Sequence, residues 1–407
     1  MNFLFAWRYF KSKKSTNAIN IIAYISVIAI TVGAAALIIV LSVFNGFESL
    51  VKNLYSDFYA DIKISPAKGQ ILQLNSQQLN TIKTNANIAA YTFVVEEKAL
   101  LKNGNNQATV LVKGVDTNYA AITNIAKHVV HGSFDVGTAH QPEIVMGAGI
   151  ENATGIFLEQ VLEKPVLFLP NKSAVKLNNL NDAFLSYNVM PTGTFVVQQE
   201  FDNKYIFTNK AFMQFMLNLD SSQYSYSEIK LKTNTDKEAA KTATLLQKNL
   251  GENFIVQTRY EQNKSLYSIM KMEKWIIYGI LSLILIVAAF NMIGALTMLV
   301  LEKQKDIAIL KAMGANNNTI KNIFINNGII LAMIGSLTGI ALATIICWLQ
   351  VKFKLLKLGG SFVVDYYPVE IRWQDFILVL VTVFVIALLA SYLPARKASK
   401  QILSLKS

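Results

Sequence analysis

The chain has 407 residues, of which 53% are hydrophobic and only 16% are charged. Soluble domains average about 25% charged residues, so this composition excludes a wholly soluble globule and indicates that part of the chain faces lipid. A net charge of +12 would suit nucleic-acid binding in a soluble protein. In a membrane protein, the position of the basic residues along the chain indicates instead which loops lie in the cytoplasm. The single cysteine excludes a disulfide framework and a zinc site built on cysteines.

Four uncharged runs are long enough to cross a bilayer as helices, which requires about 20 mostly apolar residues. They comprise the 33 residues after Lys14, the 27 after Lys274, the 30 after Lys321 and the 20 after Asp375. The first run is far longer than a signal-peptide core and follows a basic leader, so we expect it to remain as a signal anchor. The predicted spanning helices are 19–47, 275–301, 322–349 and 375–394.

The excess positive charge gathers in three segments. Residues 1–20 carry +4, the loop 302–321 carries +2, and the tail from Pro394 carries +4. The positive-inside rule places these segments in the cytoplasm. The excess positive charge is therefore explained by the orientation of the helices, and binding to nucleic acid is not required to explain it. We therefore expect cytoplasmic segments at 1–18, 302–321 and 395–407, with both termini inside, and external segments at 48–271 and 350–374.

The segment 48–271 has the polarity of a folded domain, and its pattern predicts an α+β domain of two subdomains. Asn103 and Gly104 predict a tight hairpin, because both residues accept the positive φ of a type I′ turn. A second hairpin is predicted within 193–208, and the stretch 165–191 is expected to be an irregular insertion.

A strand, a helix and a strand are predicted next, at 226–233, 236–250 and 254–259. Thr235 and Glu238 match a capping box at the start of that helix, and Gly251 suits its end.

The loop after the second spanning helix reads EKQKDIAILKAMGANNNTIKNIF. Ile307, Leu310 and Met313 recur at helical spacing, which predicts an amphipathic helix lying along the membrane. Gly314 would end this helix, and the asparagines at 316–318 could cap the next one. From these residues alone, a helix that transmits a push from a soluble partner and a passive interfacial turn are equally open interpretations.

Three motifs in the chain resemble the FtsX/MacB-like family of ABC transporter permeases. Glu302–Ala315 resembles the family's coupling helix, and Ser391–Lys406 resembles its closing signature of a proline followed by A-R-x-A. The first helix and its basic leader resemble the lipoprotein-releasing LolC/LolE branch. The resemblance extends over essentially the whole chain and implies a MacB-like periplasmic core domain between helices one and two, in the bacterial inner membrane.

The resemblance also implies partners. A second permease subunit, identical or a paralogue, would pair with this chain, and a dimer of cytoplasmic ATPase subunits would dock on the coupling helices. ATP would be used by that partner and no cofactor by this chain, which has no G-x-x-x-x-G-K-[ST] loop. Closure of the ATPase would move the helices and periplasmic domains, a behaviour called mechanotransmission, and pass an acylated lipoprotein from the membrane to a periplasmic carrier.

Such extraction needs an external energy source, because acyl chains gain about 0.8 kcal/mol for each CH₂ buried in the bilayer.

The resemblance further implies three sets of site residues, and no catalytic or metal-binding ones. The set for ATPase coupling is Glu302, Lys305, Asp306, Ile307, Ile309, Leu310, Met313 and Gly314. The set for the acyl cavity, between helices one and two of the paired subunits, is Val40, Val43, Phe44, Phe47, Ile269, Met270, Ile277 and Ile280. The loop Phe168–Pro191 resembles in position a hook that binds the carrier, with Pro170 and Phe184 as its contacts.

Other functions remain as alternatives. An FtsX-like regulator of periplasmic cell-wall hydrolases normally has a smaller periplasmic domain. A MacB-like efflux permease usually carries a fused nucleotide-binding domain before the first helix. A membrane enzyme is disfavoured because no nucleophile and base can be matched in the sequence. Within the helices, Gly335 and Gly339 predict close packing inside the chain. Asn291 predicts a hydrogen bond between helices, and lining of the cavity is the alternative.

Overall fold

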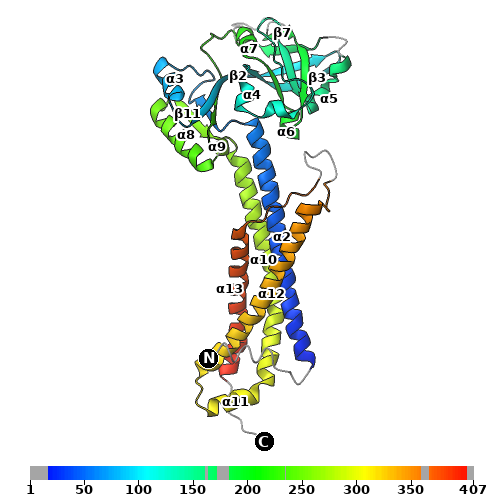
Figure 1. The fold of residues 1–407 in the computed structure, drawn as a ribbon, viewed down its shortest axis with the longest axis vertical. Helices are drawn as coiled ribbons and strands as arrows, with labels where there is room; N and C mark the ends of the chain where they lie inside the picture. The colour runs from blue at the N-terminus through cyan, green and yellow to red at the C-terminus, as the bar shows by residue number, and fades with distance from the viewer. Residues whose placement is uncertain (1–16, 161–163, 172–182, 234, 359–365, 401–407) are drawn as a thin grey trace. The chain divides into compact units, whose positions relative to one another are not determined.

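A computed structural model describes residues 17–160, 164–171, 183–233, 235–358 and 366–400 (Figure 1). The chain divides into two compact units: a helical unit, and a β-rich domain formed by residues 51–267. Four helices in the described parts are long and apolar enough to cross a membrane, as predicted. They are α2 (Asn17–Phe58), α10 (Lys264–Glu302), α12 (Asn317–Phe353) and α13 (Trp373–Ser399).

Close contact between α12 and α2 depends on glycine. A Cβ atom on Gly335 would lie 2.9 Å from the Ile30 side chain, and one on Gly339 would lie 2.5 Å from the carbonyl oxygen of Thr31. Both distances are too short for a side chain, so only glycine lets the two backbones approach this closely. The predicted packing role of this pair within the chain is confirmed.

The outer face of α10 is exposed in the single chain, with Leu283, Val287 and Phe290 each at least 60% exposed. Asn291 is exposed on α10 as well, and the expected hydrogen bond from Asn291 to another helix of this chain is not found among the described residues. The prediction was wrong for the single chain because α10 turns other residues, such as Met292, towards the helical core.

The β-rich domain is built on a mixed sheet with the strand order β11-β1-β10-β2-β3-β9-β5-β8-β4, to which β6 and β7 attach through β2. This confirms the predicted α+β class. The strands are β1 (Ile62–Pro66), β2 (Ile88–Asn103), β3 (Asn106–Val115), β4 (Val129–Gly132), β5 (Glu143–Gly147), β6 (Val166–Pro170), β7 (Phe184–Asn188), β8 (Met190–Phe195), β9 (Tyr205–Asn209), β10 (Tyr226–Leu231) and β11 (Phe254–Thr258). The helices are α3 (Ser76–Lys83), α4 (Tyr119–Ile122), α5 (Ala148–Thr154), α6 (Gln199–Asp202), α7 (Lys210–Met216), α8 (Asp236–Leu250) and α9 (Arg259–Gln262).

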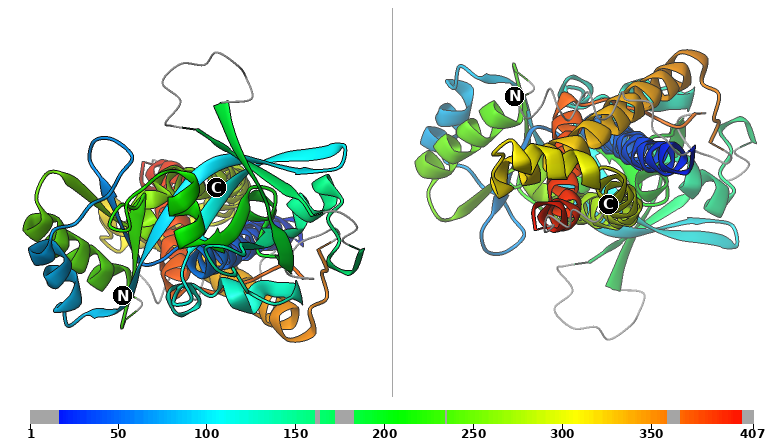
Figure 2. Two further views of the ribbon diagram at one scale, coloured as in Figure 1. Left: turned by 90° about the horizontal axis from the view of Figure 1, so that it is seen from above. Right: turned by 90° about the horizontal axis from the view of Figure 1, so that it is seen from below.

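The first predicted hairpin is confirmed, because β2 and β3 pair up to Asn103 opposite Asn106 (Figure 2, left). The predicted type I′ turn is wrong: Gly104 has φ +57°, but Asn103 ends the strand and does not have a positive φ. The second is wrong, because β5 lies between β8 and β9 and pairs with both. The connection between β8 and β9 is too long for a tight turn and forms α6 instead. Gly193 serves close packing here, since a Cβ would lie 2.3 Å from the carbonyl oxygen of Ser133.

The predicted order of strand, helix and strand is confirmed by β10, α8 and β11. Strands β10 and β11 both pair with β1. The capping box is wrong: Thr235 is the N-cap residue of α8, but its side chain accepts no capping hydrogen bond. Thr235 is exposed, so water can satisfy the first N–H groups, and Asp236 and Glu238 favour the positive end of the helix dipole. Gly251 ends α8 with φ +86°, as predicted.

The stretch expected to be an irregular insertion also differs from the prediction. Its arms β6 and β7 pair in antiparallel fashion, with Val166 opposite Asn188 and Pro170 opposite Phe184. The tip between the arms lies outside the described residues. The two strands, VLFLP and FLSYN, are too short to show a clear alternation of apolar and polar residues. A long polar stretch separates them, so the sequence pattern does not predict their pairing.

Two hydrophobic cores are found among the described residues of the β-rich domain, one under β2, β3, β5 and β9 and one under β1, β10 and α8. A buried ion pair lies on the same sheet. The Lys113 ammonium on β3 is 3.1 Å from a carboxylate oxygen of Glu228 on β10, and both side chains are at most 3% exposed. Lys113 also donates to the Tyr119 hydroxyl at 3.3 Å and lies 4.9 Å from the centre of the Phe58 ring.

Candidate functional site

The predicted coupling segment forms a helix–turn–helix at one end of the helical unit. Helix α10 ends at Glu302, and the short helix α11 (Gln304–Ala312) lies crosswise before α12 begins (Figure 2, right). Gly314 has φ +91°, a conformation that glycine adopts without strain, and reverses the chain. Asn316 then caps α12, since its side-chain oxygen accepts from the Thr319 N–H at 2.7 Å. The expected roles of Gly314 and the asparagine cluster are confirmed.

Exposure along α11 differs from the expected amphipathic stripe. Ile307 is 2% exposed and belongs to the helical core, and Leu310 is half-buried. Met313, expected on the same face, is 79% exposed because α11 ends at Ala312 and the chain turns away. Ile309, four residues before it, is 58% exposed, so the two form a solvent-facing apolar pair.

Polar contacts hold α11 in place. Lys303 is 3.5 Å from Asp306 one turn later, and Lys311 donates to the carbonyl oxygen of Ser399 on α13 at 2.9 Å. Of the remaining predicted residues, Glu302 is half-buried at the end of α10, whereas Lys305 and Gly314 are exposed. A fixed short helix with exposed apolar and basic side chains can serve as a docking element.

The eight residues predicted for an acyl cavity lie on two neighbouring helices. Four of them, on α2, are half-buried: Val40, Val43, Phe44 and Phe47. On α10, Met270 and Ile277 are half-buried, and Ile269 and Ile280 are 50% and 57% exposed. The incomplete burial leaves these side chains free to contact lipid, substrate or a second subunit, so their assignment stays a prediction.

A polar cluster that sequence reasoning missed joins three of the long helices. The Asn45 amide on α2 is fully buried; it donates to Asp375 on α13 at 2.5 Å and accepts from Lys274 on α10 at 2.7 Å. Lys274 is also 3.5 Å from Asp375. Nearby, Arg372 is 2.8 Å from Glu48. Lys274 and Asp375 were visible in the sequence only as the ends of uncharged runs, and nothing in their spacing shows that they meet.

The two residues predicted to bind a carrier lie opposite each other. Pro170 and Phe184 are paired across the β6–β7 hairpin, and both line a mostly apolar groove of about 410 Å³. Phe168 and the aliphatic parts of β2 complete the groove, and Phe184 is 51% exposed. The structure therefore brings the two predicted residues together on one accessible surface, and their role in binding a carrier stays a prediction.

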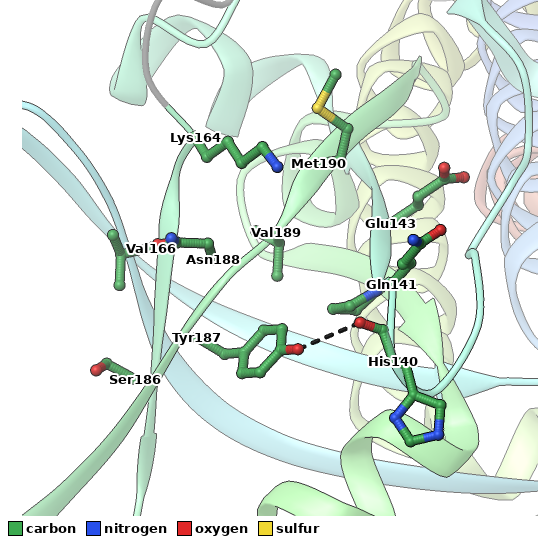
Figure 3. A pocket seen from close by; sticks show the side chains of 11 residues that line it. His140, Gln141, Glu143, Lys164, Val166, Ser186, Tyr187, Asn188, Val189 and Met190 are labelled. Atoms are coloured by element: carbon green, nitrogen blue, oxygen red, sulfur yellow. Dashed lines mark hydrogen bonds between the residues drawn. The ribbon is translucent and has the colours of Figure 1, made fainter.

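A second, polar recess of about 780 Å³ lies beside the same hairpin (Figure 3). The Tyr187 hydroxyl donates to the His140 carbonyl oxygen at 3.2 Å across its floor, and Lys164 and Glu143 line it. Partial burial, together with the nearby Asp135 carboxylate, raises the pKa of Glu143 above its usual range. The hairpin thus stands between an apolar and a polar hollow, an arrangement suited to recognising another protein.

Comparison with known families assigns both parts of the chain. The model of the MacB-like periplasmic core domain matches residues 23–244, which is more than half of the chain. The model of the FtsX-like permease C-terminal region matches residues 278–402, which include α11 and the closing P-A-R-x-A motif.

Individual relatives match nearly full length. The lipoprotein-releasing system transmembrane protein LolE of Haemophilus influenzae is 28% identical over 98% of this chain and 97% of its own. LolC of Xylella fastidiosa, also a lipoprotein-releasing system transmembrane protein, is 24% identical over 97% of this chain and 95% of its own. Among solved structures, the periplasmic region of MacB from Actinobacillus actinomycetemcomitans covers 54% of this chain and 98% of its own, with 12% identity and a TM-score of 0.36.

Proposed function

Because this chain belongs to the FtsX/MacB-like family of ABC transporter permeases, we propose that it is the permease subunit of a lipoprotein-releasing complex. The observation that carries the proposal is the similarity to LolE and LolC along almost the entire length of all three chains. That similarity includes the large domain between the first and second helices, which favours release over the FtsX-like alternative. In this proposal the chain is not itself an enzyme and binds no cofactor.

The proposed topology places both termini and α11 in the cytoplasm and the β-rich domain in the periplasm, with four crossings of the inner membrane. Its support is the distribution of positive charge, since ten of the twelve excess charges fall in the segments on the α11 side. A separate ATPase dimer and a second permease subunit, identical or a paralogue, complete the assembly.

The ATPase is proposed to dock on α11. Ile309 and Met313 support this, because large apolar side chains that are more than half exposed on a fixed helix are typical anchors of an interface. Ile307, buried in the helical core, would pass movement of α11 to the spanning helices.

A double variant tests the docking. We expect Ile309→Ser with Met313→Ser to leave thermal unfolding unchanged, since both residues are exposed, and to weaken co-purification of the native ATPase by about tenfold or more. Asn318→Ser, also exposed but polar, is the matched control. Undiminished recovery of the ATPase with the double variant would show that it docks elsewhere.

The lipoprotein is proposed to pass from the membrane through a cavity formed by α2 and α10 of the two permeases. From there it would move to a periplasmic carrier held by the β6–β7 hairpin. Depletion of the chain in its native host tests the whole proposal. Lipoproteins should then accumulate in the inner membrane, and a plasmid copy should restore their export. Normal lipoprotein sorting with altered cell-wall cleavage would instead identify an FtsX-like regulator, and sensitivity to exported drugs alone would identify an efflux permease.

A further inference from the structure

Three tryptophans mark one level of the helical unit. Trp275 lies near the start of α10, Trp348 near the end of α12, and Trp373 at the start of α13, and each is more than half exposed. Helices α10 and α12 are joined by α11, so the start of α10 and the end of α12 are both the ends remote from α11. Exposed tryptophans at the ends of apolar helices indicate the boundary between hydrocarbon and headgroups.

The chain forms a defined loop at that level. After α12, Lys354 adopts φ +50°, which reverses the backbone. The buried Gln350 side chain then fixes the reversal, because it accepts from the Leu356 N–H at 2.9 Å and donates to the Leu356 carbonyl oxygen at 3.0 Å. Leu356 in turn accepts from the Tyr367 N–H at 3.1 Å. Although its backbone is held, the loop leaves Leu355 and Leu356 65% and 63% exposed.

The same loop carries unneutralised positive charge. Residues 348–358 contain three lysines and no acidic residue, and all three are exposed. Lys352 lies 4.8 Å from the centre of the Trp348 ring, and Lys354 lies 4.2 Å from that of Tyr366. Among the described residues, no carboxylate pairs with Lys352, Lys354 or Lys357, whereas the nearby acids Glu370 and Asp375 have basic partners.

We propose that the loop Val351–Lys357 is a binding site for anionic phospholipid headgroups in the leaflet at this end of the helices. Its two leucines would enter the acyl boundary, and the three lysines would bind phosphates above it. Exposure of two adjacent leucine side chains to water is unfavourable, whereas their burial at a membrane interface is favourable. The buried Gln350 fixes the backbone of Leu356 in this exposed position. Lysines at the same level have no partner carboxylate among the described residues, and anionic headgroups supply one. The site is separate from α11 but borders the predicted acyl cavity, because Tyr367, whose N–H binds Leu356, packs edge-on against Phe47.

Fluorescence quenching by brominated lipids tests the site. Replacing Trp7, Trp275 and Trp373 by Phe leaves Trp348 as the only tryptophan, one turn from Lys352. The full chain is reconstituted in phosphatidylcholine vesicles with a minority of phosphatidylglycerol, and one or the other lipid is brominated. We expect phosphatidylglycerol to be enriched near Trp348 by about fivefold, the factor that even a single lysine near an anionic surface can provide.

Two charge-matched variants separate the loop from the overall charge. Replacing Lys352, Lys354 and Lys357 by Gln should abolish the enrichment while quenching by brominated phosphatidylcholine persists. Replacing three exposed lysines of α8 by Gln changes net charge equally and should leave the enrichment intact; these are Lys237, Lys241 and Lys248. Equal quenching by both lipids in the parent, or enrichment that survives the loop variant, overturns the proposal. Absence of quenching by either lipid also overturns it, because protein would then cover the loop.

Discussion

Removal of the ammonium from the buried pair in the β-rich domain should destabilise that domain strongly. Lys113→Met keeps the length of the side chain but leaves the Glu228 carboxylate almost fully buried, without its partner at 3.1 Å. Breaking a buried pair in this way costs about 3–5 kcal/mol. The second oxygen of Glu228 has no hydrogen-bond partner among the described residues, so little else can stabilise the remaining charge.

The pair also fixes the expected dependence on pH. Burial alone would lower the pKa of Lys113, but the combined attraction of Glu228, Tyr119, Tyr226 and Glu96 outweighs it and raises the pKa well above its usual value. A lysine whose pKa is raised in the folded state contributes its full stabilisation when the pH is below the pKa of the unfolded chain. That stabilisation is lost only as the pH rises through the raised, folded-state pKa. The penalty of Lys113→Met should therefore be constant across the neutral range.

Hydrogen exchange followed by mass spectrometry on the full chain measures this effect at β3 and β10. The matched variant is Lys113→Met with Glu228→Leu, which replaces both charges by apolar groups and should recover most of the loss. A single variant that costs less than about 1 kcal/mol, or a double variant no more stable than the single one, would refute the assignment of a charged, mutually dependent pair.

Three other predictions concern separate parts of the chain. Gly339→Ala should destabilise the helical unit by about 1–3 kcal/mol, because the added Cβ would overpack against α2. Gly279→Ala is the control, since a Cβ there meets nothing within 4 Å, and it should be neutral or stabilising by at most about 1 kcal/mol. Calorimetry in detergent compares the unfolding of the two variants. Asp375→Ala should lower the unfolding temperature in the same assay, because Asn45 loses a buried acceptor worth about 1–3 kcal/mol, and an unchanged temperature would contradict this. Phe184→Ser should change stability by less than about 0.5 kcal/mol but reduce capture of the periplasmic carrier, and unaltered capture would place the carrier elsewhere.

Sequence patterns predicted the features that depend on local chemistry. Uncharged runs located the four long helices, Asn103 and Gly104 located a turn, and Gly251 located a helix end. These signals succeed because desolvation and backbone conformation act on a few neighbouring residues. The spacing of apolar residues located α11, whereas the family resemblance supplied its coupling role and the choice of Pro170 and Phe184.

The failures concern features set by distant parts of the chain. The pattern at 193–208 resembles a hairpin, but β5 from an earlier segment pairs with both strands. Asn45 meets Lys274 and Asp375 through the packing of three helices, and no spacing encodes that meeting. Met313 has the right periodicity for a buried face, but its exposure depends on where α11 ends.

The positions of the tryptophans have a practical consequence for spectroscopy. None of the four tryptophans of the chain falls in residues 51–267, and the three in the described residues all lie at one end of the helical unit. Emission from the intact chain therefore reports on the surroundings of the helices and is blind to the β-rich domain. A melting curve recorded by this signal could remain unchanged while the sheet unfolds, and tyrosine-based or backbone probes would be needed to see it.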